Sequence, residues 1–194
     1  MSSLLSFSRF IDSMNEKIGT AISWALLAAV LICSGNALVR YAINTSSNAW
    51  LEIQWYLFGA IFLLASAHTL KRNEHVRIDV VVGRFSKRTQ VWIDVFGFIF
   101  FLLPATLLIL YFAVPFAMES VRNQEVSSNA GGLILWPAKV LIPIGFLLLT
   151  LQGVSELIKR IGYLQGLVDA SEFEKQAPSH AEDIEAIKAA KQIN

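Results

Sequence analysis

The sequence contains little of the chemistry on which most enzymes depend. It has one cysteine and three histidines in 194 residues, so it lacks the cysteines for an intrachain disulfide or a Cys/His metal cluster. A haem-binding membrane cytochrome needs two facing histidines, but His68 and His75 flank one helix end and His180 lies near the C-terminus. No Ser/His/Asp grouping, phosphate-binding loop or HExxH motif occurs. The sequence therefore predicts a non-catalytic chain with no cofactor of its own.

Charged residues are also scarce, at 16% against 55% hydrophobic residues. A soluble domain of this length and composition would expose large apolar patches. The apolar residues instead form four runs, each long enough at about 1.5 Å per residue to cross a hydrocarbon core of about 30 Å. We therefore predict an all-α integral membrane protein whose domain, 1–168, has transmembrane helices at about 18–39, 50–70, 91–113 and 138–158.

Lysine and arginine are unevenly divided between the connections. They precede the first run, crowd the segment 71–88 between the second and third runs, and follow the fourth at Lys159 and Arg160. The other two connections hold only Arg40 and Arg122. Because short loops rich in lysine and arginine stay inside, we expect both termini to be cytoplasmic. The charged tail, 169–194, is predicted to be disordered or weakly helical there.

The segment Val76 to Phe85, between the second and third runs, alternates apolar with charged residues. This pattern suits an interfacial segment whose basic groups face anionic lipid on the inner membrane surface. Its β-branched residues leave helix and extended chain both open. The basic loop lacks the stacking aromatics of a nucleic-acid site, so we expect membrane lipids and no nucleic acid as partners.

Three ionisable residues lie near the ends of the predicted spans. Glu52 and Lys139, at the outer starts of the second and fourth spans, either pair with each other or are solvated at the interface. Asp94, one turn into the third span, is expected to form a structural clamp with Arg77 or Lys87. A proton relay is disfavoured, because no second ionisable group lies deeper in that run.

Several uncharged residues also have predicted roles. Pro104 lies in the middle of the third run and predicts a kink. Asn36 and Gln152 are expected to form interhelical hydrogen bonds. Trp50 and Trp136 are expected at the outer membrane interface, where indole rings gather.

Two stretches of the sequence resemble a known family. The first comprises Trp50-Leu51-Glu52-Ile53-Gln54-Trp55, Ala67-His68-Thr69-Leu70-Lys71 and Glu74-His75-Val76-Arg77-Ile78-Asp79. The second comprises Trp136-Pro137-Ala138-Lys139 and Ile142-Pro143-Ile144-Gly145-Phe146. Both are similar to the DctQ-like small permease subunits of TRAP (tripartite ATP-independent periplasmic) transporters. The similarity extends over nearly all of 18–160, although Ile53 stands where many members carry a second acidic residue.

The resemblance implies a multi-pass subunit of the bacterial inner membrane that scaffolds a large, many-helix permease subunit. Such a transporter performs secondary active transport, a symport in which an ion gradient drives uptake of an organic acid or similar solute. A periplasmic solute-binding protein delivers the solute, and sodium ions are expected in the large subunit. The candidate subunit-interface or structural residues are Trp50, Glu52, Trp55, His75, Arg77, Asp79, Asp94, Trp136 and Lys139.

The residues taken alone also allow a different class of protein. Small-residue helix faces and a basic loop would serve equally well in an independent four-helix assembly or regulatory protein that has no transport partner. The stretch from Trp50 to Asp79 favours the transporter subunit.

Overall fold

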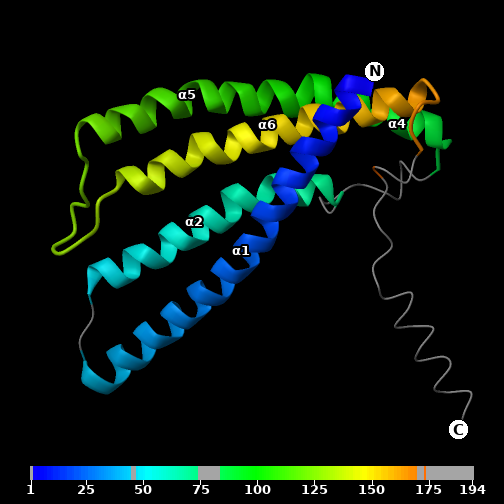
Figure 1. Cartoon of the computed structure of the whole chain (residues 1–194). Helices are drawn as coiled ribbons and strands as arrows, with labels where there is room; N and C mark the ends of the chain where they lie inside the picture. Colours follow the sequence, from blue (N-terminus) through cyan, green and yellow to red (C-terminus); the bar gives the residue numbers. More distant parts are fainter. Residues whose placement is uncertain (1, 45–46, 74–83, 170–172, 174–194) are drawn as a thin grey trace, which may run out of the picture.

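The computed structural model describes residues 2–44, 47–73, 84–169 and 173 (Figure 1). Its helices are α1 (Ser2–Ile43), α2 (Asn48–Lys71), α4 (Lys87–Gly97), the π-helical turn η1 (Phe98–Leu102), α5 (Leu103–Arg122) and α6 (Trp136–Leu164). The described residues hold no strand, only an isolated bridge between Val126 and Ile134. Four helical segments are long and apolar enough to cross a membrane. The predicted all-α fold is therefore confirmed for the described residues, with four helices long and apolar enough to span a membrane.

The bundle has two different ends (Figure 1). At the hairpin end, α1 gives way to α2, and the loop 123–135 joins α5 to α6. The terminal end holds the start of α1, the end of α2, the start of α4 and the end of α6. The cytoplasmic placement of the termini stays a prediction. The interfacial segment Val76 to Phe85, with Arg77 and Asp79, lies almost entirely outside the described residues, as do His75 and nearly all of the tail.

Helix α6 lies at the centre of the bundle and contacts α1, α2, α4 and α5. Glycines let its neighbours approach closely. A Cβ added at Gly145 would lie 2.7 Å from Leu63 Cβ and 2.9 Å from the Leu63 carbonyl oxygen. One added at Gly153 would lie 2.6 Å from Leu102 Cδ2. Small residues therefore set the distance of α2 and η1 from α6, as is common where membrane helices pack.

Helix α1 differs from α6 in length and in burial. It runs for 42 residues, well beyond the predicted span, and is about 63 Å long at about 1.5 Å per residue. Its N-terminal half crosses α6, and its C-terminal half lies along α2 (Figure 1). The helix extends past the apolar run because Ser8, Ile11 and Asn15, which precede that run, are buried against the bundle.

The third span is one helical rod, 87–122, interrupted by a π turn at the position of the predicted kink. In a regular α-helix the ring of Pro104 would clash with the carbonyl of Phe100, four residues earlier. In the π turn the Leu103 N–H donates to the Phe98 carbonyl, five residues earlier. We attribute the π turn to Pro104, because the wider turn relieves this clash.

Candidate functional site

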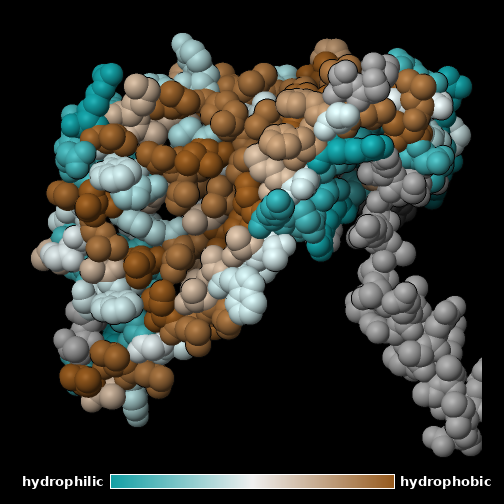
Figure 2. Space-filling model, in the orientation of Figure 1, coloured by the Kyte–Doolittle hydropathy of each residue, from teal (hydrophilic) through white to brown (hydrophobic). Residues whose placement is uncertain are grey.

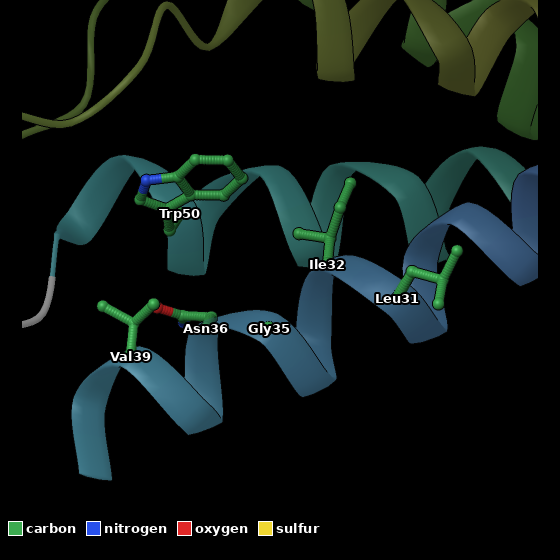
Figure 3. Close-up of a pocket in the computed structure, with 6 residues that line it drawn as sticks. All are labelled: Leu31, Ile32, Gly35, Asn36, Val39 and Trp50. Carbon is green, nitrogen blue, oxygen red and sulfur yellow. The ribbon is translucent and has the colours of Figure 1, made fainter. Parts of the chain in front are cut away.

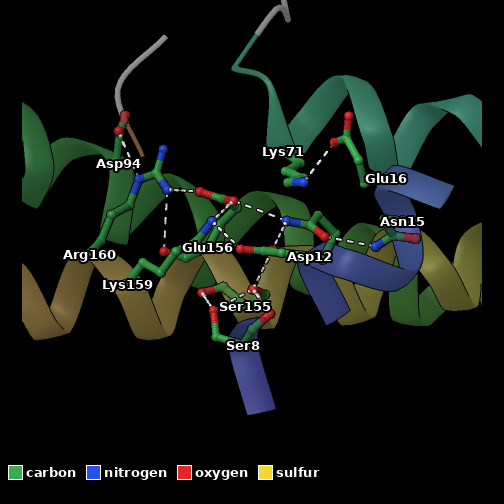
Figure 4. A network of polar contacts seen from close by, with 11 residues as sticks. Ser8, Asp12, Asn15, Glu16, Lys71, Asp94, Ser155, Glu156, Lys159 and Arg160 are labelled. Carbon is green, nitrogen blue, oxygen red and sulfur yellow. Dashed lines mark hydrogen bonds and ion pairs between the residues drawn. The ribbon is translucent and has the colours of Figure 1, made fainter. Parts of the chain in front are cut away.

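Polar side chains gather at both ends of an otherwise apolar bundle. The terminal cluster joins α1, α4 and α6 and consists of Ser8, Asp12, Asn15, Asp94, Gln152, Ser155, Glu156, Lys159 and Arg160 (Figure 4). The hairpin cluster joins α2 to the loop 123–135 and consists of the side chains of Asn48, Glu52, Tyr56, Ser127 and Asn129 together with the backbone N–H of Leu133.

The ion pairs of the terminal cluster form a continuous chain. Lys159 Nζ lies 3.0 Å from Asp12 Oδ2 and 2.5 Å from Glu156 Oε1. Arg160 lies 2.5 Å from Glu156 Oε2 and 3.0 Å from Asp94 Oδ2. The side chains of Lys159, Arg160 and Glu156 are at most 3% exposed. A buried unpaired charge costs several kcal/mol, so this mutual pairing is what allows the charges to lie inside the bundle.

Amides and hydroxyls extend the terminal cluster towards α1. Asn15 Nδ2 donates to Gln152 Oε1 at 2.7 Å, and Gln152 Nε2 donates to Asp12 at 2.8 Å and to Glu156 at 3.0 Å. The predicted interhelical hydrogen bonds of Gln152 are therefore confirmed. The prediction is wrong for Asn36, whose side chain has no hydrogen-bond partner among the described residues.

Asp94 forms an ion pair with Arg160, at 3.0 Å. The sequence predicts a structural clamp between Asp94 and Arg77 or Lys87, and that choice of partner stays a prediction. The guanidinium of Arg160 also lies 4.7 Å from the centroid of the Phe98 ring and 5.2 Å from that of Phe173. From the sequence alone, Arg160 is predicted only to belong to the basic flank of the fourth span. The spacing of 152, 156 and 160 is the signal that places these side chains on one helical face.

A second ionic contact joins α1 to the end of α2. Glu16 lies 2.7 Å from Lys71 Nζ and 3.0 Å from Arg72, with His68 Nδ1 at 3.6 Å. Gly19 makes room for the imidazole, because a Cβ there would lie 2.4 Å from His68 Cγ. These contacts fix the terminal half of α1 on α2 as well as on α6.

At the hairpin end, Glu52 organises the loop. Its buried carboxylate accepts hydrogen bonds from Ser127 Oγ, from Asn129 Nδ2 at 2.9 Å and from the Leu133 N–H at 2.6 Å. Both expectations for this residue, pairing with Lys139 and solvation at the interface, are therefore wrong. The loop offers three hydrogen-bond donors to the Glu52 carboxylate, so this carboxylate is satisfied without an ion pair to Lys139.

Lys139 instead pairs with Glu125, within the same loop region. Its Nζ lies 2.5 Å from Glu125 Oε2 and 4.4 Å from the centroid of the Phe116 ring. The Lys139 ammonium holds the pKa of the Glu125 carboxyl below its ordinary value. This pair closes the base of the loop, where α5 ends and α6 begins.

Further contacts give the loop a fixed shape on α2. Tyr56 Oη donates to the Ile134 carbonyl at 2.7 Å, and Asn48 Nδ2 donates to the Ala130 carbonyl at 2.9 Å. Gly132 is required at its position, because a Cβ there would lie 2.5 Å from Ser127 Cβ. The loop is therefore an ordered platform at the hairpin end.

Large apolar side chains remain on the outside of the bundle. Figure 2 shows hydrophobic residues over much of the surface formed by α5 and α6. Trp50 and Trp55 of α2 are about half exposed, and Trp136 is partly buried at the start of α6. The most exposed on α1 and α5 include Trp24, Leu38, Tyr41, Phe100, Phe101, Tyr111 and Phe112. Such a surface contacts lipid or another membrane protein.

Among the described residues, no group of three or more His, Cys, Asp and Glu side chains is placed to hold a metal ion. The contacts of the two polar clusters join α1 to α4 and α6, and α2 to the loop 123–135.

Comparison with known proteins supports one family. No curated protein matches the chain. The family model of the DctQ component of tripartite ATP-independent periplasmic transporters matches residues 29–162, which is more than half of the chain and includes both stretches that carry the resemblance. The chain therefore belongs to the DctQ family of TRAP transporter components.

Proposed function

We propose that this DctQ-family chain is the scaffold of a TRAP transporter and that it holds the large permease subunit in place without itself conducting the solute. Membership of the family makes it a small permease subunit. In the proposal the large subunit carries the sodium and solute sites, a periplasmic binding protein delivers an organic acid or similar solute, and the complex lies in the bacterial inner membrane with the termini of this chain in the cytoplasm.

The observation that carries the proposal is how the buried charges are used. Lys159, Arg160, Glu156 and Glu52 all contact other groups of this chain. A translocation path needs polar groups that face a cavity and are free to meet the solute. Here the buried charges fasten helices and a loop, while the apolar sides of α1 and α5 remain uncovered. This division suits a rigid supporting subunit.

The two ends receive separate roles in the proposal. The ordered loop at the hairpin end borders the surface on which the binding protein lands. The interfacial segment with Arg77 and Asp79 anchors the complex to lipid and to the large subunit on the opposite side. Replacing Arg77 and Asp79 together is expected to weaken assembly.

The test is recovery of the partner. We expect the tagged chain, solubilised mildly from native membranes, to co-purify stoichiometrically with one large polytopic permease identified by mass spectrometry. Deletion of the chain should abolish solute uptake. Recovery of the chain alone, as a stable homo-oligomer, would contradict the proposal and favour an independent membrane protein.

A matched pair of variants locates the docking side. Trp24 on α1 is 70% exposed and Phe112 on α5 is 63% exposed, so alanine at either position leaves the core of this chain intact. Loss of the permease from only one of the two variants would identify its docking side. Full recovery with both, and with the double variant, would show that neither side carries the contact.

A further inference from the structure

A groove lies between α1 and α2 near the hairpin end (Figure 3). Its volume is about 430 Å³, and Leu31, Ile32, Gly35, Asn36, Val39 and Trp50 line it. The space beside Gly35 is open, because no atom lies within 4 Å of the position that a Cβ at Gly35 would take. We call this space the α1–α2 groove.

The polarity of the α1–α2 groove changes along α1. Leu31 and Ile32 line the part deeper in the bundle, and Asn36 lies one turn nearer the hairpin end (Figure 3). Arg40, in the last turn of α1, follows Asn36 by four residues and so lies on the same side of the helix. The lining of the groove therefore changes from apolar residues to an amide along α1, and Arg40 follows one turn beyond that amide on the same side of the helix.

Neither polar group is satisfied within the part of the chain that the structure describes. Asn36 and Arg40 have no hydrogen-bond or ion-pair partner there. Lys139, another cation of the hairpin end, is already paired with Glu125. Trp50 lines the groove from the first turn of α2, and indole rings are enriched at the level of lipid headgroups in membrane proteins. The guanidinium of Arg40 would be paired by a negatively charged group of a ligand, and the apolar lining of the groove would be covered by a hydrocarbon chain.

We infer that the α1–α2 groove binds one anionic phospholipid. An acyl chain lies along Leu31, Ile32 and Gly35. The Asn36 amide donates to an ester carbonyl at the glycerol level, and Arg40 pairs with the phosphate. These groups occur along the lipid in the same order as their protein partners occur along α1. The inference is independent of the transport role, since it uses only groups of this chain and its membrane.

Native mass spectrometry of the delipidated full chain in mild detergent tests the charge contact. The probes are phosphatidylglycerol and phosphatidylcholine with the same acyl chains. We expect one tight phosphatidylglycerol adduct per chain. Binding of this lipid to Arg40→Gln should be about fivefold weaker, because one basic residue changes the affinity for an anionic lipid surface by about that factor. Arg122→Gln, at the end of α5, is the matched control and should leave the affinity unchanged. Equal effects of the two substitutions would mean unspecific charge attraction and would overturn the inference.

A second pair of variants tests the apolar part. Gly35→Leu fills the groove and should weaken the binding of both lipids. Gly59→Leu, at a glycine of α2 that also has open space beside it, should leave the binding of both lipids unchanged. Unchanged thermal unfolding would show that both variants are folded. Unchanged phosphatidylglycerol affinity in Gly35→Leu would overturn the site.

The competing occupant is a transmembrane helix of a partner protein. A photoreactive amino acid placed at Val39 in native membranes distinguishes the two. Crosslinking to phospholipid supports the inference, and crosslinking to a protein overturns it.

Discussion

The two ends of the bundle place polar groups next to the membrane core in different ways. At the terminal end, charged side chains from α1, α4 and α6 neutralise one another inside the protein. At the hairpin end, Glu52 is satisfied by neutral donors from a loop, and Arg40 has no partner among the described residues. The terminal end is thus closed on itself, while the hairpin end keeps polar groups available to other molecules.

Helix α1 shows the same contrast within one element. Its first half is tied to α6 by Asp12 and Asn15 and to α2 by Glu16. Its second half makes one polar contact to another helix among the described residues: the thiol of Cys33 donates to Gln54 Oε1 at 3.3 Å. A long helix fastened at one end therefore presents its other half to lipid or to a partner.

The largest expected effect comes from breaking the terminal cluster at Arg160. Arg160→Leu leaves Glu156 and Asp94 without that cation, and removing one partner of a buried ion pair costs about 3–5 kcal/mol. Thermal unfolding in detergent should show a large loss of stability. Arg122→Leu, at an exposed position of the hairpin end, should have little effect.

Equal thermal midpoints for Arg160→Leu and Arg122→Leu would show that the terminal cluster does not hold the bundle together. In that case the two ends would differ in their contacts but not in their contribution to stability. Partial recovery of stability in Arg160→Leu combined with Asp94→Leu would confirm that the uncompensated carboxylate is the cause.

A smaller, local effect is expected from Glu52→Ala. This change leaves Ser127, Asn129 and the Leu133 N–H without their acceptor, at about 1–3 kcal/mol for an unsatisfied buried group. Because these groups belong to a loop, the helices should remain packed. Hydrogen exchange at the Leu133 amide should become about tenfold faster, while thermal unfolding changes much less than in Arg160→Leu.

Glu119→Ala is the control for the loop, because Glu119 is exposed at the same end of the bundle. Unaltered exchange at Leu133 in Glu52→Ala would mean that Glu52 does not order the loop. Bundle unfolding as severe as in Arg160→Leu would show that the two ends contribute equally to stability.

The sequence predicts the spans well because membrane helices obey a simple requirement for about 20 apolar residues. The irregularity at Pro104 follows from the chemistry of proline in the same direct way. The extension of α1 before residue 18 was missed, because its buried residues are mostly polar and are stabilised by partners on α6 that are distant in the sequence.

The partners of the ionisable residues could be predicted only in part. Asp94 was placed in a clamp, but its pairing with Arg160 depends on how α4 packs against α6. Glu52 was expected near Lys139 because both lie at the outer starts of spans. The fold of the loop 123–135 decides the partners of both residues, since it supplies the Leu133 N–H to Glu52 and the Glu125 carboxylate to Lys139. Register between distant helices and loop shape are tertiary properties that periodicity does not contain.

The smallest expected effect is a pH dependence at the hairpin end. Glu125 has a pKa below its ordinary value of 4.5 when it lies beside Lys139 in the folded protein. The carboxylate therefore favours the folded state above pH 4.5, and this contribution disappears as the pH falls through the lowered pKa. The Glu125 side chain is 36% exposed, so solvent screens the pair and the effect is modest.

Glu125→Gln isolates this contribution. The thermal midpoint of the wild type should exceed that of Glu125→Gln at neutral pH, and the difference should vanish in acid. Glu119→Gln should show no such convergence, because Glu119 has no comparable cation partner among the residues that the structure describes. A constant difference between wild type and Glu125→Gln from neutral to acidic pH would mean that the amide disturbs packing and that the ion pair contributes nothing. The hairpin end would then depend for its order on Glu52 and the hydrogen bonds of the loop, which would sharpen its contrast with the ionic terminal end.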